Sequence, residues 1–158
     1  MPIPDEHAIA SFRKFYKHIP RTKDQSLVIL KLHLLVEEQI RTYVDGRLPH
    51  KEKLAKISCH QAICLAEALS TENINPAIWE AARKLNSLRN KIAHHLEPEN
   101  ILSQAKNIAL LFGIENAPSD PQNLSTEESI LEDFAFAISM VHGAISLHAK
   151  PTTQSSQA

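Results

Sequence analysis

The sequence predicts an all-α protein, a five- or six-helix, mostly up-and-down bundle, from three observations. Its 158 residues contain only three glycines and 5% aromatic residues, which is unusual for a β-sandwich. Apolar residues recur every three to four positions along most of the chain, as in amphipathic helices. Capping signals mark several helix starts. The length suits one domain, expected at residues 1–149 and followed by a disordered polar tail at 150–158.

The first half of the chain is expected to form three helices, of which the first is short and covers residues 6–18. Residues 26–44 alternate apolar and polar side chains at 30–34 as a strand does, but apolar positions continue at helical spacing to Tyr43. We therefore predict a helix here, covered on several sides because it is almost uniformly apolar. A third helix is expected at 51–69. Its inward residues would be Leu54, Ile57, Leu65 and Leu69.

A fourth helix has the clearest start signal in the chain. Asn75 can cap its first turn, and Pro76 suits the first helical position, where a missing N–H costs nothing. Pro98 indicates where this helix ends. The apolar positions at helical spacing are Ile78, Ala82, Leu85, Leu88, Ile92 and Leu96.

Two further helices are expected in the C-terminal third. A shorter one covers about 99–112, and the longest loop follows at 113–123. Ser125 and Glu128 form a capping box. They open a long helix that continues at helical spacing to His148.

Charge and cysteine content limit the function classes. The 17 basic and 18 acidic residues nearly balance, so no global field attracts nucleic acid or an anionic membrane. Cys59 and Cys64 lie five residues apart, which is neither CxxC spacing nor a disulfide framework. The first twelve residues lack the apolar stretch of a secretory leader, and no run approaches the length of a membrane span. We expect a cytoplasmic protein without a membrane contact.

One polar cluster stands out, SLRNKIAHHL at residues 87–96. On an ideal helix of roughly 100° per residue, Arg89 falls near the middle of the apolar stripe. Asn90 and His94 are neighbours on another face, and His95 points away from both. Arg89 and His94 are about 140° apart, so their side chains leave a straight helix on different sides.

The position of Arg89 requires a partner, because an uncompensated buried guanidinium costs several kcal/mol. Glu37 and Glu38, on the other central helix, are the obvious carboxylates. The alternative is a groove in which an anion or solvent reaches the guanidinium.

The three residues suit RNA cleavage through the substrate's own 2′-OH. This reaction needs a base, an acid and positive charge on the phosphorane. His94 can act as base or acid near neutral pH. Arg89 can hold two phosphate oxygens. Asn90, one turn from His94, can orient its ring or donate to phosphate. No metal and no cofactor is required.

The hexapeptide from Arg89 to His94, RNKIAH, resembles the R-x(4–6)-H motif of the HEPN superfamily in the form where a polar residue follows the arginine. The resemblance extends over roughly residues 20–148. It implies a helical bundle that dimerises across its motif-bearing helices, and an endoribonuclease of a toxin–antitoxin, phage-defence or RNA-processing system. Arg89 and His94 would be the residues needed for cleavage, with Asn90 as the polar residue, RNA as the substrate and an antitoxin protein as a possible partner. Toxins paired with nucleotidyltransferases often have Tyr where this chain has Leu96.

Two alternative functions stay open. In the first, the protein is a non-catalytic interaction module in which Arg89 forms an ion pair and His94 ends a helix. In the second, it binds a nucleotide or another anion in the same groove without cutting.

Other candidates are weaker. The histidines at positions 33, 50 and 60 lack a metal-binding spacing, so no metal site is predicted. Both thiols are expected to be core residues. A basic cluster could steer RNA but is also typical of a solvated face. It consists of Arg47, Lys51, Lys53 and Lys56.

Overall fold

The computed structural model describes residues 6–115 and 125–149, and all regular secondary structure in this part of the chain is helical. The predicted tail at 150–158 and most of the predicted loop at 113–123 lie outside the described residues. The elements are α1 (Glu6–His18), α2 (Gln25–Asp45), a 3₁₀ turn η1 (Lys51–Lys53), α3 (Cys59–Leu69), α4 (Pro76–His94), α5 (Ile101–Leu110) and α6 (Thr126–Ser146). The prediction of an all-α bundle is confirmed.

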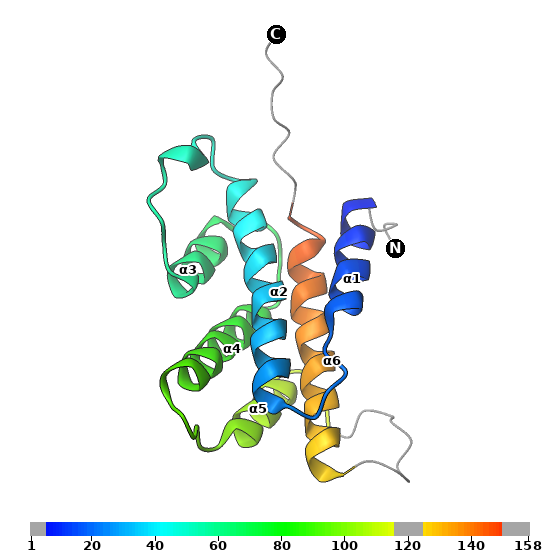
Figure 1. Cartoon of the computed structure of the whole chain (residues 1–158). Helices are drawn as coiled ribbons and strands as arrows, with labels where there is room; N and C mark the ends of the chain where they lie inside the picture. Colours follow the sequence, from blue (N-terminus) through cyan, green and yellow to red (C-terminus); the bar gives the residue numbers. More distant parts are fainter. Residues whose placement is uncertain (1–5, 116–124, 150–158) are drawn as a thin grey trace.

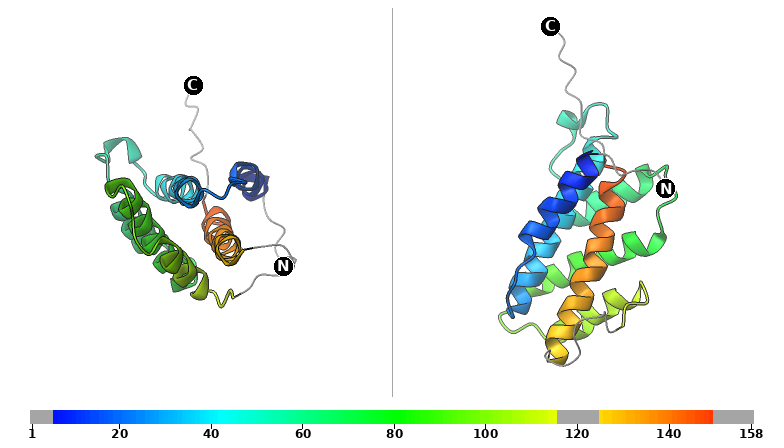
Figure 2. Two further views of the ribbon diagram at one scale, coloured as in Figure 1. Left: turned by 60° about the horizontal axis from the view of Figure 1, so that its bottom comes forward. Right: turned by 90° about the vertical axis from the view of Figure 1, so that its right-hand side faces the viewer.

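The helices form two layers (Figures 1 and 2). In the first, α1, α2 and α6 lie side by side, with α1 antiparallel to α2 and α6 running in the direction of α2 (Figure 1). In the second, α3, α4 and α5 are inclined to α2, so only the first layer has the predicted up-and-down arrangement. α2 packs against α3, α4 and α6, which is the cover on several sides that its apolar sequence predicts. None of the described helices has the length and apolar character that crossing a bilayer needs.

Two helix starts follow the predicted capping chemistry. The Asn75 side chain accepts a hydrogen bond from the backbone N–H of Ala77 at 3.0 Å, and Pro76 is the first residue of α4. Ser125 and Glu128 form both hydrogen bonds of a capping box at the start of α6.

The prediction of one helix over 51–69 is wrong in its first half. α3 begins only at Cys59, because Ser58 and Gln61 form a capping box that fixes the helix start there. Leu54, expected to face the core, is 40% exposed. The capped start places Cys59 at the first turn of α3, beside α2.

The core is centred on α2. Tyr43 of α2 is fully buried, and its ring meets the ring of Trp79 on α4 edge to face at 5.8 Å. The large, fully buried aliphatic side chains that α2 and α4 contribute are Ile29, Leu32, Ile40, Leu85 and Leu88. This packing fixes the faces of α2 and α4 relative to each other, and a polar pocket opens beside it.

A buried histidine on α6 lies between α6 and α1. His142 is 2% exposed, and its ring centroid is 4.5 Å from that of Phe15 on α1. Burial lowers the pKa of His142 to about 4. The charge of Glu38 acts to raise this pKa, and the charge of Lys14 acts to lower it. The imidazole is therefore neutral in the folded protein at neutral pH.

We expect His142 to make the protein acid-sensitive. Because its folded pKa lies below the ordinary value of 6.5, the unfolded chain takes up the proton first, and stability falls as the pH drops from about 6.5 toward 4. Between pH 8 and pH 5 this histidine alone lowers the free energy of unfolding by about 2 kcal/mol. Urea unfolding at the two pH values measures the effect. From pH 8 to pH 5, the free energy of unfolding of His142→Gln should fall by about 2 kcal/mol less than that of wild type. His50→Gln, at an exposed histidine, should follow wild type, and equal losses in all three proteins would contradict the prediction.

Candidate functional site

A pocket of about 330 Å³ lies between α2, the start of α3 and the C-terminal half of α4. α4 contributes Asn86, Arg89 and Asn90, which lie on consecutive turns of one side of the helix. α2 and the start of α3 contribute His33, Glu37, Ser58, Cys59 and His60. Nearly every lining side chain is polar or titratable, so the pocket is suited to a polar or charged ligand.

Arg89 is half-buried at this pocket. Its guanidinium donates to Asn90 Oδ1 at 3.1 Å, and no carboxylate of the described residues pairs with it. Of the two alternatives for Arg89, the ion pair with Glu37 or Glu38 is therefore not found among the described residues. Arg41, one turn along α2, donates to Glu37 Oε1 at 2.6 Å, and Lys14 of α1 pairs with Glu38. The groove alternative matches the position of Arg89.

His94 does not line the pocket. It lies exposed in the last turn of α4, five residues after Arg89, and this separation turns the two side chains to different sides of the helix. The structure thus brings Arg89 and Asn90 together within one chain and leaves His94 apart. His60, exposed near the start of α3, is a lining histidine that the sequence interpretation did not assign to this site.

One residue of the pocket wall is a buried histidine, His33, which is 3% exposed. Its Nε2 lies 3.1 Å from Asn86 Oδ1 and 3.5 Å from Cys59 Sγ. Its Nδ1 lies 3.6 Å from Glu37 Oε2, and this nitrogen has no hydrogen-bond partner among the described residues. The sequence interpretation missed this group because its members come from three helices. The available signal was the i, i+4 spacing of His33 and Glu37.

Burial dominates the electrostatics of this group. It lowers the pKa of His33, while the hydrogen bond to Asn86 and the charge of Glu37 act in the opposite direction. Burial also raises the pKa of the Cys59 thiol to about 11. The charge of Arg89 lowers both pKa values. At neutral pH the wall therefore presents a neutral imidazole and a protonated thiol, with Arg89 as the cation available to a ligand.

The two thiols differ from the prediction that both are core residues. Cys59 is half-buried and lines the pocket, whereas Cys64 is exposed, with its Sγ 3.6 Å from His60 Nε2. Each thiol of α3 thus has a histidine neighbour: Cys59 approaches His33 of α2 in the pocket wall, and Cys64 approaches His60 of α3 on the surface.

The predicted basic cluster is divided in the structure. Arg47 pairs with Glu72, donates to the carbonyl oxygens of Tyr43 and His148, and lies over the Tyr43 ring at 3.4 Å. Its role is therefore structural. Lys53 and Lys56 remain exposed.

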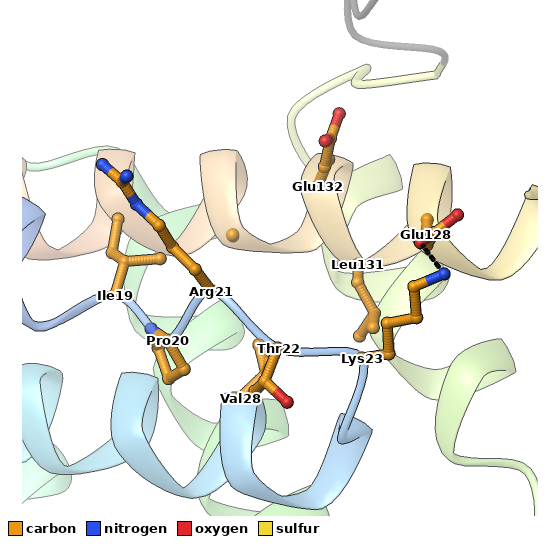
Figure 3. Close-up of a pocket in the computed structure, with 10 residues that line it drawn as sticks. Ile19, Pro20, Arg21, Thr22, Lys23, Val28, Glu128, Leu131 and Glu132 are labelled. Atoms are coloured by element: carbon orange, nitrogen blue, oxygen red, sulfur yellow. Dashed lines mark ion pairs between the residues drawn. The ribbon is translucent and has the colours of Figure 1, made fainter. Parts of the chain in front are cut away.

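A second pocket, of about 440 Å³, lies between the α1–α2 loop and α6 (Figure 3). Its Lys23 pairs with Glu128 at 2.8 Å, and Arg21 extends away from this pair (Figure 3). This wall lacks the buried titratable group that distinguishes the first pocket.

Comparison with known proteins identifies no relative from which a function could be transferred. No model of a known protein family matches the chain, and neither does any curated protein or solved structure.

Proposed function

We propose that the protein is a metal-independent endoribonuclease of the HEPN type. Arg89 would hold the scissile phosphate and stabilise the phosphorane, His94 would transfer protons, and Asn90 would orient the phosphate or the histidine ring. The setting would be a cytoplasmic toxin–antitoxin or phage-defence system, with an antitoxin protein as the partner that restrains cleavage.

The availability of Arg89 is the observation that carries this proposal. A half-buried guanidinium that pairs with no carboxylate of the described residues has donors free for an anion, and a bidentate contact with phosphate suits its planar geometry. The interaction-module alternative requires Arg89 in a structural ion pair. Glu37, which lines the same pocket, and Glu38 are already engaged by other cations.

The separation of His94 from the pocket favours a symmetric homodimer. His94 is exposed on the side of α4 away from Arg89, so a twofold partner that meets α4 can bring its own His94 to this pocket. Each composite site would then combine Arg89 of one protomer with the histidine of the other.

A second function, anion or nucleotide binding without cleavage, is favoured by the pocket lining of a single chain. Arg89, Asn86 and Asn90 offer a cation and two amides, whereas His33 in the same wall is buried and neutral. Such a pocket can hold a phosphate even where no proton transfer follows.

Incubation of the purified protein with mixed RNAs in EDTA tests the proposal. We expect cleavage that leaves 2′,3′-cyclic phosphate ends, because attack by the 2′-OH needs no metal. DNA of the same sequence should stay intact since it lacks that hydroxyl. Binding of RNA or nucleotides without any cleavage would instead establish the anion-binding function, and neither binding nor cleavage would reject both.

A further inference from the structure

Three side chains of the pocket wall place metal-binding atoms close together. A nitrogen of His33, a carboxylate oxygen of Glu37 and Cys59 Sγ all lie within 4.8 Å of one another. Atoms bound to one zinc ion at 2.0–2.3 Å in tetrahedral geometry stand roughly 3.3–3.8 Å apart. Cys59 Sγ lies 3.5 Å from Nε2 of the His33 ring, and Glu37 Oε2 lies 3.6 Å from Nδ1. One ion binds only one ring nitrogen, so rotation of the side chains from their present separation of up to 4.8 Å is needed to bring all three ligand atoms onto it.

His33 has an unsatisfied nitrogen that faces an anion. When Nε2 carries the ring proton and donates it to Asn86 Oδ1, Nδ1 presents a lone pair. This buried nitrogen has no hydrogen-bond partner among the described residues, and it faces Glu37 Oε2, which is also an acceptor. Two acceptors facing each other at 3.6 Å repel each other, and a cation between them removes the repulsion.

The other bonds of these side chains leave the metal-binding atoms free. Arg41 occupies Glu37 Oε1 through its Nε and Nη2, at 3.0 and 2.6 Å, so Oε2 stays available. Asn86 holds the remaining ring nitrogen of His33. Metal-binding histidines and carboxylates commonly have such outer hydrogen bonds, which fix the ring tautomer and the orientation of the carboxylate.

We propose that His33, Glu37 and Cys59 form a Zn²⁺ site whose fourth position opens into the pocket shared with Arg89. A thiolate, an imidazole and a carboxylate together suit zinc better than the oxygen-preferring Mg²⁺ or Ca²⁺. Three protein ligands leave one position for water or an anion. Binding forms a Zn–S bond and releases the Cys59 thiol proton to solvent, so no redox partner is needed. The proposal does not depend on RNA cleavage.

Titration of the chelator-treated full-length protein with Co²⁺, which substitutes for zinc, tests the site. We expect one bound ion per chain, a thiolate-to-cobalt charge-transfer absorption, and displacement of the cobalt by Zn²⁺. Cys59→Ser should abolish the charge-transfer band, and Glu37→Gln should weaken binding by about 100-fold. Both changes nearly preserve side-chain volume at half-buried positions, and circular dichroism of the apo proteins checks that the helices remain.

Cys64→Ser is the matched control, because Cys64 also has a histidine neighbour on α3 but is exposed. This variant should bind the ion and show the band as wild type does. The proposal is overturned if the wild type binds no ion, if Cys59→Ser keeps the band, or if Cys64→Ser removes it. Because the readout is metal binding, an inactive wild type in the RNA assay would leave the zinc proposal unaffected.

Discussion

Arg89→Ala and His94→Ala are each expected to slow RNA cleavage by about 100-fold or more. Loss of Arg89 removes the positive charge that holds the phosphate, and loss of His94 removes the proton transfer. The measurement is the rate at which a labelled RNA yields cyclic phosphate ends. If both variants cut as fast as wild type, the assignment of the site fails.

Two further variants separate chemistry from folding. His95→Ala alters the neighbouring exposed histidine and should cut at the wild-type rate. Arg89→Lys keeps the charge but loses the planar fork, so an intermediate rate is expected. Arg89→Ala should change the free energy of unfolding by less than about 1 kcal/mol, because it strands no carboxylate within residues 6–115 and 125–149. A loss of several kcal/mol would favour the interaction-module function.

Mixing the two inactive variants tests whether the site is shared between protomers. A heterodimer of Arg89→Ala and His94→Ala chains contains one composite site with both residues intact. When subunits of the two variants exchange at random, half of the dimers are heterodimers, and each of these has one intact site of two. The mixture should therefore regain about a quarter of the wild-type activity. Two inactive chains cannot complement each other if the site lies within one chain. If His94→Ala is itself active, His60, which lines the pocket, is the alternative proton-transfer group, and His60→Ala should then be inactive.

Most of the helices follow from local sequence signals, and the errors arise where two signals compete. Asn75-Pro76 and the Ser125–Glu128 pair determine the starts of α4 and α6 through contacts within one turn, so the sequence alone identifies them. Ser58 and Gln61 have the same capping spacing, but the apolar periodicity across 51–69 suggested an unbroken helix. The capping box prevails because the preceding segment has little to bury, as the exposure of Leu54 shows.

The candidate site is only partly predictable for a physical reason. The helical wheel places Arg89 near the middle of the apolar stripe and Asn90 on another face beside His94, whereas in the structure Arg89 and Asn90 are both half-buried and line one pocket. The partner of Glu37 depends on which of two cations is nearer, and Arg41 at i+4 on the same helix prevails over Arg89 from a neighbouring helix. The approach of Cys59 to His33 depends on how α3 packs against α2, which periodicity does not encode.

Trp79→Ala is expected to have the largest effect on stability. The indole is 3% exposed and packs edge to face on the fully buried Tyr43, so the truncation leaves a cavity between α4 and α2. The expected loss is about 3–5 kcal/mol, a large share of the 5–15 kcal/mol typical of a domain. Urea unfolding followed by far-ultraviolet circular dichroism measures it, since Trp79 is the single tryptophan and fluorescence would be lost.

Leu96→Ala is the matched control for this truncation, because Leu96 is fully exposed just after α4. It should change the free energy of unfolding by less than about 0.5 kcal/mol. The contrast also bears on the site, since the Tyr43–Trp79 contact holds α2 against the helix that carries Arg89. A small effect of Trp79→Ala would mean that α4 is not fixed against α2 by this core. The pocket between the two helices would then lack the rigidity that RNA cleavage and metal binding both require.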